Sequence, residues 1–372
     1  MNKLRQFIDK CGGILEAGAV KKERAACAPE ELHIELTYRC NTSCIMCNLR
    51  YINKPENEPD TARWIEVIKN SKLLKGVRFI VLSGGEPWLK EGFVEFVAAL
   101  RANYPGISIL ILSNLIDAEL ALGGILKIKK AVGLGNISLG SSIDGIGDHH
   151  DRIRNKNGSF ELFSNTLERV KKEYPELHFT LNFTLTPENC GQMVAVYDWC
   201  AERSYHVSFQ VMVQKKETKK FEWKKEHLDI ISAQLDELTD KMAPGFEPGA
   251  KNAMALITNE GLFSLITSIH YIEKYVRSQR RFFPNCPCGS KYAMLDPYGN
   301  LYFCPVHKSL VAGNVFKDGF DALWNSQKAG EISCYFAKRE CDCWLTCTNG
   351  YMIGDAIRAS KDRLVKECLA AD

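Results

Sequence analysis

The chain has 372 residues, of which 45% are hydrophobic and 25% are charged. This is ordinary globular composition, and it excludes a collagen, a coiled coil and a wholly disordered chain. The 48 Lys and Arg residues nearly balance the 45 Asp and Glu residues, so charge gives no reason to expect a nucleic-acid partner. With no signal peptide and no apolar run long enough to span a membrane, we expect a cytoplasmic protein. Its 15 cysteines therefore indicate metal or redox chemistry rather than disulfides.

Residues 32–213 alternate short apolar, β-branched runs with segments of helical period. Strands are predicted at 32–37, 77–82, 108–112, 136–139, 178–185 and 206–213, and helices at 62–75, 93–104, 159–174 and 189–203. Strands and helices that alternate at this spacing form right-handed crossovers and a parallel sheet, so the predicted fold class is α/β. Six strands are too few for a closed eight-stranded barrel, which leaves a partial barrel or a doubly wound sheet. In both folds, ligands bind at the carboxyl ends of the strands.

The rest of the chain does not follow this pattern. We predict an N-terminal helical extension at 1–31 and a helical linker at 215–285, with helices at 228–242 and 257–277. The linker opens with a lysine-rich run, KKETKKFEWKK, which is most simply a solvated helix face. Residues 286–372 are rich in cysteine and turn signals but have little periodicity. We therefore expect metal to hold this last domain together.

Three cysteines directly follow the first predicted strand. They are Cys40, Cys44 and Cys47 in the segment CNTSCIMC, so one loop can bring all three to a single cluster. Three thiolates on a [4Fe–4S] cube leave one iron open to a substrate or cofactor. A zinc site is the alternative, but it needs a fourth ligand from a distant part of the chain.

Polar residues also stand where the next three predicted strands end. The glycines of the SGGEP segment let the backbone approach a ligand closely, and Glu86 offers a carboxylate to an amine. Asp144 can accept hydrogen bonds from ribose hydroxyls, and Arg154 can bind a carboxylate with two hydrogen bonds. The candidate cofactor-binding residues are Gly84, Gly85, Glu86, Ser113, Asn114, Ser142, Asp144 and Arg154.

The succession CNTSCIMC, SGGEP, SSIDG and HDRIR resembles the radical S-adenosylmethionine (SAM) enzymes over residues 32–213. The resemblance implies a partial (β/α)6 barrel in which the three cysteines hold a [4Fe–4S] cluster whose open iron is chelated by SAM. It implies that residues 84–86 contact the SAM amine. It further implies that Ser142 and Asp144 contact the ribose and that Arg154 pairs with the methionyl carboxylate.

The cysteines of the last domain carry a second resemblance. The spacing from Cys288 through Gly299 to Cys304 is similar to the opening of the SPASM domain, which binds auxiliary iron–sulfur clusters. Where that pattern has another cysteine this chain has Ala337, and we expect the displaced Cys341 to replace it. We divide the cysteines into two groups of four, although two zinc sites remain an alternative that spacing does not exclude. The groups are Cys286, Cys288, Cys304, Cys347 and Cys334, Cys341, Cys343, Cys368.

The resemblance implies a radical enzyme. Reductive cleavage of SAM, with an electron from flavodoxin or ferredoxin, gives a 5′-deoxyadenosyl radical that abstracts a hydrogen atom from the substrate. One or two auxiliary clusters would serve this reaction, one of them as electron acceptor. Relatives with full SPASM domains mostly act on peptides, so we expect a peptide or protein to be oxidised or crosslinked. No catalytic residue is identified from the sequence.

Two alternatives to peptide modification remain open. One is oxidation or epimerisation of a small molecule or sugar, because residues 1–31 are too short for a peptide-recognition domain. The other is a non-enzymatic metal or electron-transfer protein, which the SAM-binding motifs argue against, since a carrier needs no SAM pocket.

Overall fold

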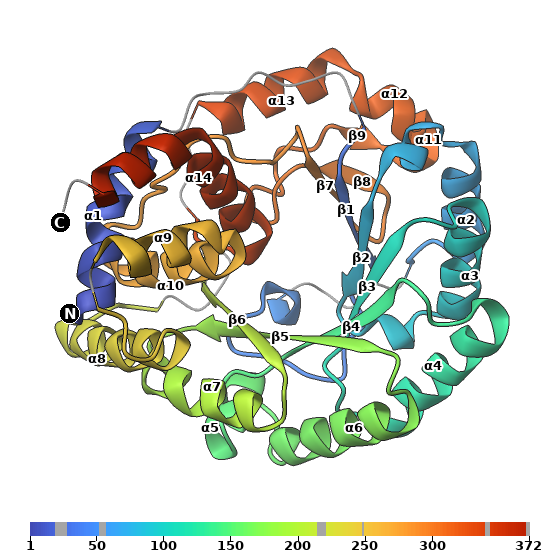
Figure 1. Cartoon of the computed structure of the whole chain (residues 1–372). Coiled ribbons are helices and arrows are strands. Elements are labelled where there is room, and N and C mark those ends of the chain that lie inside the picture. Colours follow the sequence, from blue (N-terminus) through green and yellow to red (C-terminus); the bar gives the residue numbers. More distant parts are fainter. Residues whose placement is uncertain (19–27, 52–56, 214–220, 248, 339–342, 370–372) are drawn as a thin grey trace.

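The computed structural model describes residues 1–18, 28–51, 57–213, 221–247, 249–338 and 343–369, and a single sheet lies at its centre (Figure 1). Six parallel strands follow one another in sequence order, and helices cover the outer side of the sheet. The strands are β1 (Glu31–Thr37), β2 (Phe79–Gly84), β3 (Ser108–Leu112), β4 (Ile137–Ser142), β5 (His178–Leu185) and β6 (His206–Val211). The predicted α/β fold with a partial (β/α)6 barrel is confirmed.

The faces of the sheet differ in polarity, as strand β1 shows. Its Leu32, Ile34 and Leu36 are buried in the hydrophobic core, whereas the side chains between them are polar and partly exposed. Successive side chains of a strand point to opposite faces, so the polar set faces the barrel interior. The interior of the barrel is therefore suited to a polar ligand.

Six helices connect the parallel strands. They are α2 (Thr61–Asn70), α3 (Phe93–Asn103), α4 (Ala118–Val132), α5 (Asp148–Arg154), α6 (Ser159–Glu173) and α7 (Met193–Glu202). The sequence did not predict α4, which contains Gly123 and Gly124. Glycine lowers helix propensity and obscures the pattern, but the missing Cβ of Gly124 leaves room for the ring of Trp88.

The sheet does not end with the barrel. Strand β7 (Tyr292–Leu295) pairs in parallel with the other edge of β1, and β8 (Asn300–Tyr302) and β9 (Gly313–Asn314) continue antiparallel. Nine strands thus form one sheet in the order β6-β5-β4-β3-β2-β1-β7-β8-β9. The cysteine-rich region is therefore built directly onto the strand that leads into the cysteine loop, a connection the sequence did not predict.

A group of helices packs beside β6 and the cysteine-rich region (Figure 1). It comprises α1 (Lys3–Gly18), α8 (Lys225–Met242), α9 (Ala250–Thr258), α10 (Glu260–Ser278) and α14 (Thr346–Leu369). The predicted helix at 257–277 is divided in two, because the side chain of Asn259 accepts a hydrogen bond from the backbone N–H of Leu262 and caps a new helix. Among the described residues, no helix is long and apolar enough to cross a membrane.

The last quarter of the chain is more regular than predicted. It contains α11 (Val315–Asp318), α12 (Phe320–Trp324), α13 (Gln327–Ala337) and α14. Trp324 and Trp344 are fully buried there, so apolar packing also holds this region together. Gly350 and Gly354 lower the helix propensity of α14, which explains why a 24-residue helix was not predicted.

A buried charge network joins α1 to α8 and α10. The guanidinium of Arg5 is almost inaccessible to solvent, and it pairs with Asp236 at 2.8 Å and with Glu273 at 2.5 Å. Its Nε also donates to Nδ1 of His270 at 3.4 Å. Because removal of one partner leaves a buried charge uncompensated, this network fixes the N-terminal helix on the other two.

The same network predicts a pH dependence of stability. Burial, together with Arg5 and Lys274, lowers the pKa of His270 from 6.5 to about 4. The unfolded chain therefore binds more protons than the folded chain in this window, and stability falls as pH decreases from about 6.5 to about 4. For this group the slope approaches about 1.4 kcal/mol per pH unit.

His270→Gln should flatten that part of the profile, measured by denaturant unfolding at about pH 5 and pH 7. His206→Gln is the matched control, because His206 is exposed at the start of β6. Parallel profiles for the parental and His270→Gln proteins would contradict this prediction.

Candidate functional site

The cysteine loop, residues 38–47, leaves the carboxyl end of β1 and is held there by backbone pairing. The N–H of Gly85 donates to the carbonyl of Thr37 at 2.7 Å, and the N–H of Glu86 donates to that of Arg39 at 2.8 Å. On another side, the carboxylate of Glu58 accepts the N–H of Tyr38 at 2.6 Å. These hydrogen bonds fix the loop in position without any contribution from its thiols.

The two glycines of the SGGEP segment have a structural reason to be glycine. A Cβ on Gly84 would lie less than 3.0 Å from the carbonyl oxygen of Thr37, and one on Gly85 less than 3.0 Å from that of Arg39. Gly84 also has a φ of 136°. The glycines therefore allow the end of β2 to approach the cysteine loop, and their predicted contact with a ligand stays a prediction.

Two of the three loop thiols lie beside the hydroxyl of Thr42. The Sγ of Cys40 lies 3.3 Å from this hydroxyl, and the thiol of Cys44 lies 3.6 Å from it. Cys40 is exposed, Cys47 is partly buried and Cys44 is buried. Over the described part of the chain, no three His, Cys, Asp or Glu side chains converge as a site for one metal ion requires.

Glu86 is buried beside this loop and only half satisfied. Its Oε2 accepts the backbone N–H of Asn114 at 2.8 Å, but its Oε1 has no hydrogen-bond partner among the described residues. Burial raises the pKa of this carboxyl to about 7. The side chain of Asn114 donates to Asn41 of the loop at 2.7 Å, and Ser113 beside it is buried. The end of β3 thus connects Glu86 to the cysteine loop.

Asp144 and Arg154 lie together, although the sequence predicted a ribose contact for the first and a carboxylate contact for the second. Nη2 of Arg154 is 2.9 Å from Oδ2 of Asp144, and both side chains are buried. The other carboxylate oxygen accepts the backbone N–H of Thr184 at 2.9 Å. Nη1 of Arg154 donates to Sγ of Cys44 at 3.5 Å. Ser142, at the end of β4, is partly exposed.

Apart from Oδ2 of Asp144 and Nη2 of Arg154, which pair with each other, two buried polar atoms at this site have no hydrogen-bond partner in the described chain. They are Oε1 of Glu86, an acceptor, and Nε of Arg154, a donor. An acceptor suits an ammonium group and a guanidinium donor suits a carboxylate, and the methionyl part of SAM carries one of each. The residues present therefore fit the cofactor that the sequence motifs imply.

Further polar residues, which the sequence analysis did not identify, stand inside the barrel mouth. Lys308 of the cysteine-rich region pairs with Glu35 of β1 at 2.6 Å, and the hydroxyl of Tyr38 donates to the same carboxylate at 3.1 Å. His33, also on β1, is hydrogen-bonded to Ser83 at the end of β2. Alternation in the segment ELHIELT was the signal that would have placed Glu35 and His33 on the inner face.

The C-terminal cysteines form one evident group. The thiol of Cys288 is hydrogen-bonded to those of Cys286 and Cys304, and these bonds raise its pKa well above the ordinary value. Burial, with the thiols of Cys343, Cys304 and Cys286 nearby, likewise raises the pKa of Cys347. The structure thus brings Cys286, Cys288 and Cys304 of the first predicted group into contact, whereas Cys347 and Cys343 lie within electrostatic range of them.

The second predicted group is described only in part. Cys334 is exposed on α13, and Cys343 is buried with its Sγ 3.6 Å from the hydroxyl of Thr348. Cys341 lies outside the described residues, so its predicted substitution for a cysteine at Ala337 stays a prediction. Cys368 lies on the last turn of α14, and the structure does not describe its side chain.

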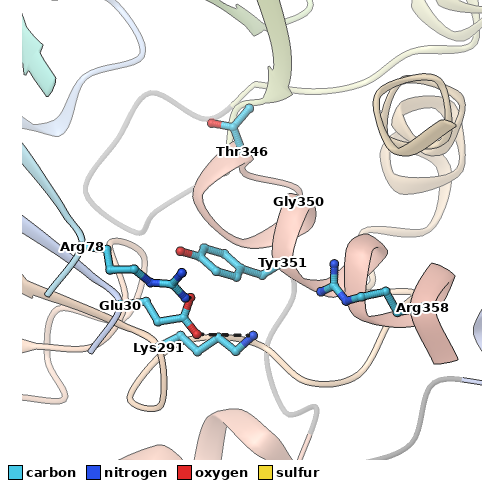
Figure 2. A pocket seen from close by; sticks show the side chains of 7 residues that line it. All are labelled: Glu30, Arg78, Lys291, Thr346, Gly350, Tyr351 and Arg358. Carbon is cyan, nitrogen blue, oxygen red and sulfur yellow. Dashed lines mark hydrogen bonds and ion pairs between the residues drawn. The ribbon is translucent and has the colours of Figure 1, made fainter. Parts of the chain in front are cut away.

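A pocket of about 520 Å³ lies at the opposite end of the sheet (Figure 2). Its lining residues are Glu30, Arg78, Lys291, Thr346, Gly350, Tyr351 and Arg358. Arg78 and Lys291 precede the amino ends of β2 and β7, whereas parallel sheets bind ligands at the carboxyl ends. Its cations are paired, Arg78 with Glu30 at 3.0 Å and Arg358 with Asp355 at 2.8 Å. This pocket is therefore not the candidate active site.

Comparison with known families identifies two regions of the chain. Residues 34–200 match the radical SAM superfamily, and residues 286–348 match the SPASM iron–sulfur cluster-binding domain. The chain belongs to the radical SAM superfamily and carries a C-terminal SPASM region. Both resemblances predicted from the sequence are confirmed.

For three curated relatives, the chain spans about half of their own length or less. The sporulation killing factor maturation protein SkfB of Bacillus subtilis is 28% identical over 46% of this chain and 40% of its own length. Fe-coproporphyrin III synthase of Methanosarcina barkeri is 28% identical over 56% of this chain and 52% of its own length. PqqA peptide cyclase of Xanthomonas campestris is 31% identical over 47% of this chain and 46% of its own length.

A solved structure shares the fold over most of the chain. Streptococcus suis SuiB, bound to the precursor peptide SuiA, superposes with a TM-score of 0.58 at 16% identity. The similarity covers 88% of this chain and 70% of SuiB.

Proposed function

We propose that this protein uses SAM to oxidise or crosslink a peptide or protein substrate by radical chemistry. The observation that supports this most directly is the pair of unpartnered buried atoms, Oε1 of Glu86 and Nε of Arg154, on elements that contact the cysteine loop. One accepts and the other donates, so together they match the amino and carboxylate groups of SAM. A protein that only stored or transferred electrons would have no use for this arrangement.

Each residue at this site has a proposed part. Cys40, Cys44 and Cys47 would hold a [4Fe–4S] cluster, which supplies the electron that cleaves SAM to methionine and a hydrogen-abstracting 5′-deoxyadenosyl radical. Glu86 would bind the amine of SAM, with Asn114 fixing the orientation of its carboxylate. Arg154 would bind the carboxylate of SAM.

The remaining predicted contacts stay proposals. Ser142, at the end of β4, would contact the ribose, and Asp144 would act there beside Arg154. Ser113 would support Glu86 from the end of β3. A flavodoxin or ferredoxin would deliver the electron.

Cysteines of the SPASM region would hold the auxiliary clusters. We assign Cys286, Cys288, Cys304 and Cys347 to one of them, which the contacts of Cys288 with Cys286 and Cys304 support. The second set, Cys334, Cys341, Cys343 and Cys368, is assigned from the sequence alone. The auxiliary cluster would take the electron that substrate oxidation releases.

A peptide substrate is supported by the names of two relatives, a maturation protein and a peptide cyclase. The barrel mouth offers Lys308, Glu35 and His33 to a polar substrate. Further in, the side-chain amide of Gln210 on β6 donates to Thr184 at 3.1 Å and accepts from the hydroxyl of Thr346 at 3.2 Å. Amides and hydroxyls of this kind suit a peptide backbone.

Oxidation of a small molecule is the second candidate, because Fe-coproporphyrin III synthase is among the relatives. Anaerobic formation of 5′-deoxyadenosine separates the two. Precursor peptides should stimulate it above the rate without substrate, whereas porphyrins and sugar alcohols should not. The reverse result would favour the second candidate.

The role of the auxiliary cluster predicts the effect of a ligand change. Cys304→Ser should lower the amount of oxidised product formed per 5′-deoxyadenosine, because electron acceptance fails while SAM cleavage continues. Cys200→Ser, a buried cysteine on α7, is the control and should keep the parental ratio. A parental ratio in Cys304→Ser would make the clusters structural.

A further inference from the structure

Arg154 brings a permanent positive charge against the cysteine loop. Its Nη1 donates to Sγ of Cys44 at 3.5 Å inside the protein. The guanidinium of Arg154 is always charged in a protein, and it contacts one of the three loop thiols directly.

The fold holds this contact in register from both sides. The N–H of Ile45 donates to the carbonyl of Ile153 at 2.9 Å, and the side chain of Asn155 donates to the hydroxyl of Ser43 at 2.9 Å. The neighbours of Arg154 are thus bound to the neighbours of Cys44. The approach of the guanidinium to the thiol is a consequence of how α5 docks on the loop, rather than of one side-chain rotamer.

Asp144 opposes this charge at short range. Its carboxylate lies 2.9 Å from Nη2 of Arg154 and is completely buried, so solvent does not screen it. Thr184 holds its other oxygen at 2.9 Å, which keeps the carboxylate in place beside Arg154. The loop thiols therefore lie next to the positive charge of Arg154, and the negative charge of Asp144 lies on the far side of that guanidinium.

We propose that Arg154 and Asp144 set the reduction potential of the cluster that the cysteine loop would hold, the first raising it and the second lowering it. Hydrogen bonds to cluster sulfur, nearby charge and burial are the means by which a protein tunes such a potential. A cation that donates to a ligating thiolate stabilises the reduced, more negative state. This inference rests on the proposed cysteine-loop cluster, but it concerns the reduction potential of that cluster, which can be measured without SAM.

Opposite signs make the proposal testable. In an anaerobic redox titration followed by electron paramagnetic resonance, without SAM or substrate, Arg154→Gln should lower the midpoint potential and Asp144→Asn should raise it. For Arg154→Gln we expect the ratio of oxidised to reduced cluster at a fixed potential to rise about tenfold, which is about 59 mV for one electron. Asp144→Asn should shift the ratio several-fold in the other direction, because it removes the negative charge that lies behind Arg154. Asn keeps the oxygen that accepts the N–H of Thr184, so the local structure should be preserved.

Arg152→Gln is the matched control. It removes the same charge from the same helix, but Arg152 is exposed and its Nη2 contacts His149 instead of the cysteine loop. This variant should keep the parental potential. Arg154→Gln could fail to fold, because it leaves the buried carboxylate of Asp144 unpaired. In that case the midpoint potential of Asp144→Asn is compared with that of the double variant Arg154→Gln, Asp144→Asn. The double variant should have the lower potential.

The signal of the loop cluster is the part of the spectrum that is lost when Cys40, Cys44 and Cys47 are replaced together. If no signal is lost, the proposed function is wrong. If that signal is present but Arg154→Gln leaves its potential unchanged, or Asp144→Asn lowers it, the proposed cluster stands and this inference is wrong.

Discussion

Replacing Cys40, Cys44 and Cys47 together by alanine should abolish 5′-deoxyadenosine formation and remove one cluster from the reconstituted protein. The three thiols follow β1 in one loop, and that loop is fixed by backbone bonds from the SGGEP segment, which the substitutions leave in place. With one loop cluster and two auxiliary clusters, about four of about twelve iron atoms per chain should be lost. The measurements are iron content and anaerobic SAM cleavage.

A second triple variant controls for the number of thiols removed. Cys11, Cys190 and Cys200 are buried outside the grouped cysteines, and their replacement by alanine should leave the iron content at the parental value. Formation of 5′-deoxyadenosine by the Cys40, Cys44, Cys47 variant would show that the SAM site lies elsewhere. Equal iron loss in both triple variants would refute the assignment of the loop cluster.

The barrel and the cysteine loop were predictable because their signals are local. Strand β3 was predicted with its observed bounds, since its apolar run is short and bounded by turns. The loop cysteines could be placed at a strand end for the same reason. The sequence shows which groups directly follow a strand. Because all strands of a parallel sheet end at the same edge, these groups must lie at that edge.

The contacts between distant segments were not predictable in this way. The sequence assigned Asp144 and Arg154 to different groups of SAM, but it gave no indication that they pair with each other and with Cys44. Likewise, Lys308 is one of many lysines until β7 pairs with β1 and brings the cysteine-rich region over the barrel mouth. Such contacts depend on how α5 and β7 dock, and docking leaves no periodic pattern in the sequence.

Strand β1 separates the two cluster regions along its length. Cys40 follows the carboxyl end of β1, whereas Cys288 precedes β7, whose Tyr292 lies opposite Glu31 at the amino end of β1. Electron transfer between a loop cluster and an auxiliary cluster would therefore run along β1, with His33 and Glu35 projecting into the barrel between them. A substrate would meet both clusters in this part of the barrel interior.

Gly85→Ala should impair SAM cleavage severely although it removes no ligand. The added Cβ would lie less than 3.0 Å from the carbonyl oxygen of Arg39 and would touch Cβ of Cys40. To relieve this clash, the bond between the N–H of Glu86 and the carbonyl of Arg39 must break, which displaces Glu86 and the first loop cysteine from one another. A displacement of about 1 Å at a reacting centre costs roughly 100-fold in rate, so we expect a loss of that order in 5′-deoxyadenosine formation.

Gly123→Ala supplies the matched control for this substitution. Gly123 lies inside α4, and a Cβ there meets nothing within 4 Å, so this variant should keep full SAM cleavage and gain about 0.5–1 kcal/mol of stability. Thermal unfolding distinguishes a displaced site from a disrupted fold, because overpacking at Gly85 should cost only about 1–3 kcal/mol. If Gly85→Ala cleaves SAM at the parental rate, the close approach of β2 to the cysteine loop does not position the cofactor, and the glycines serve folding alone.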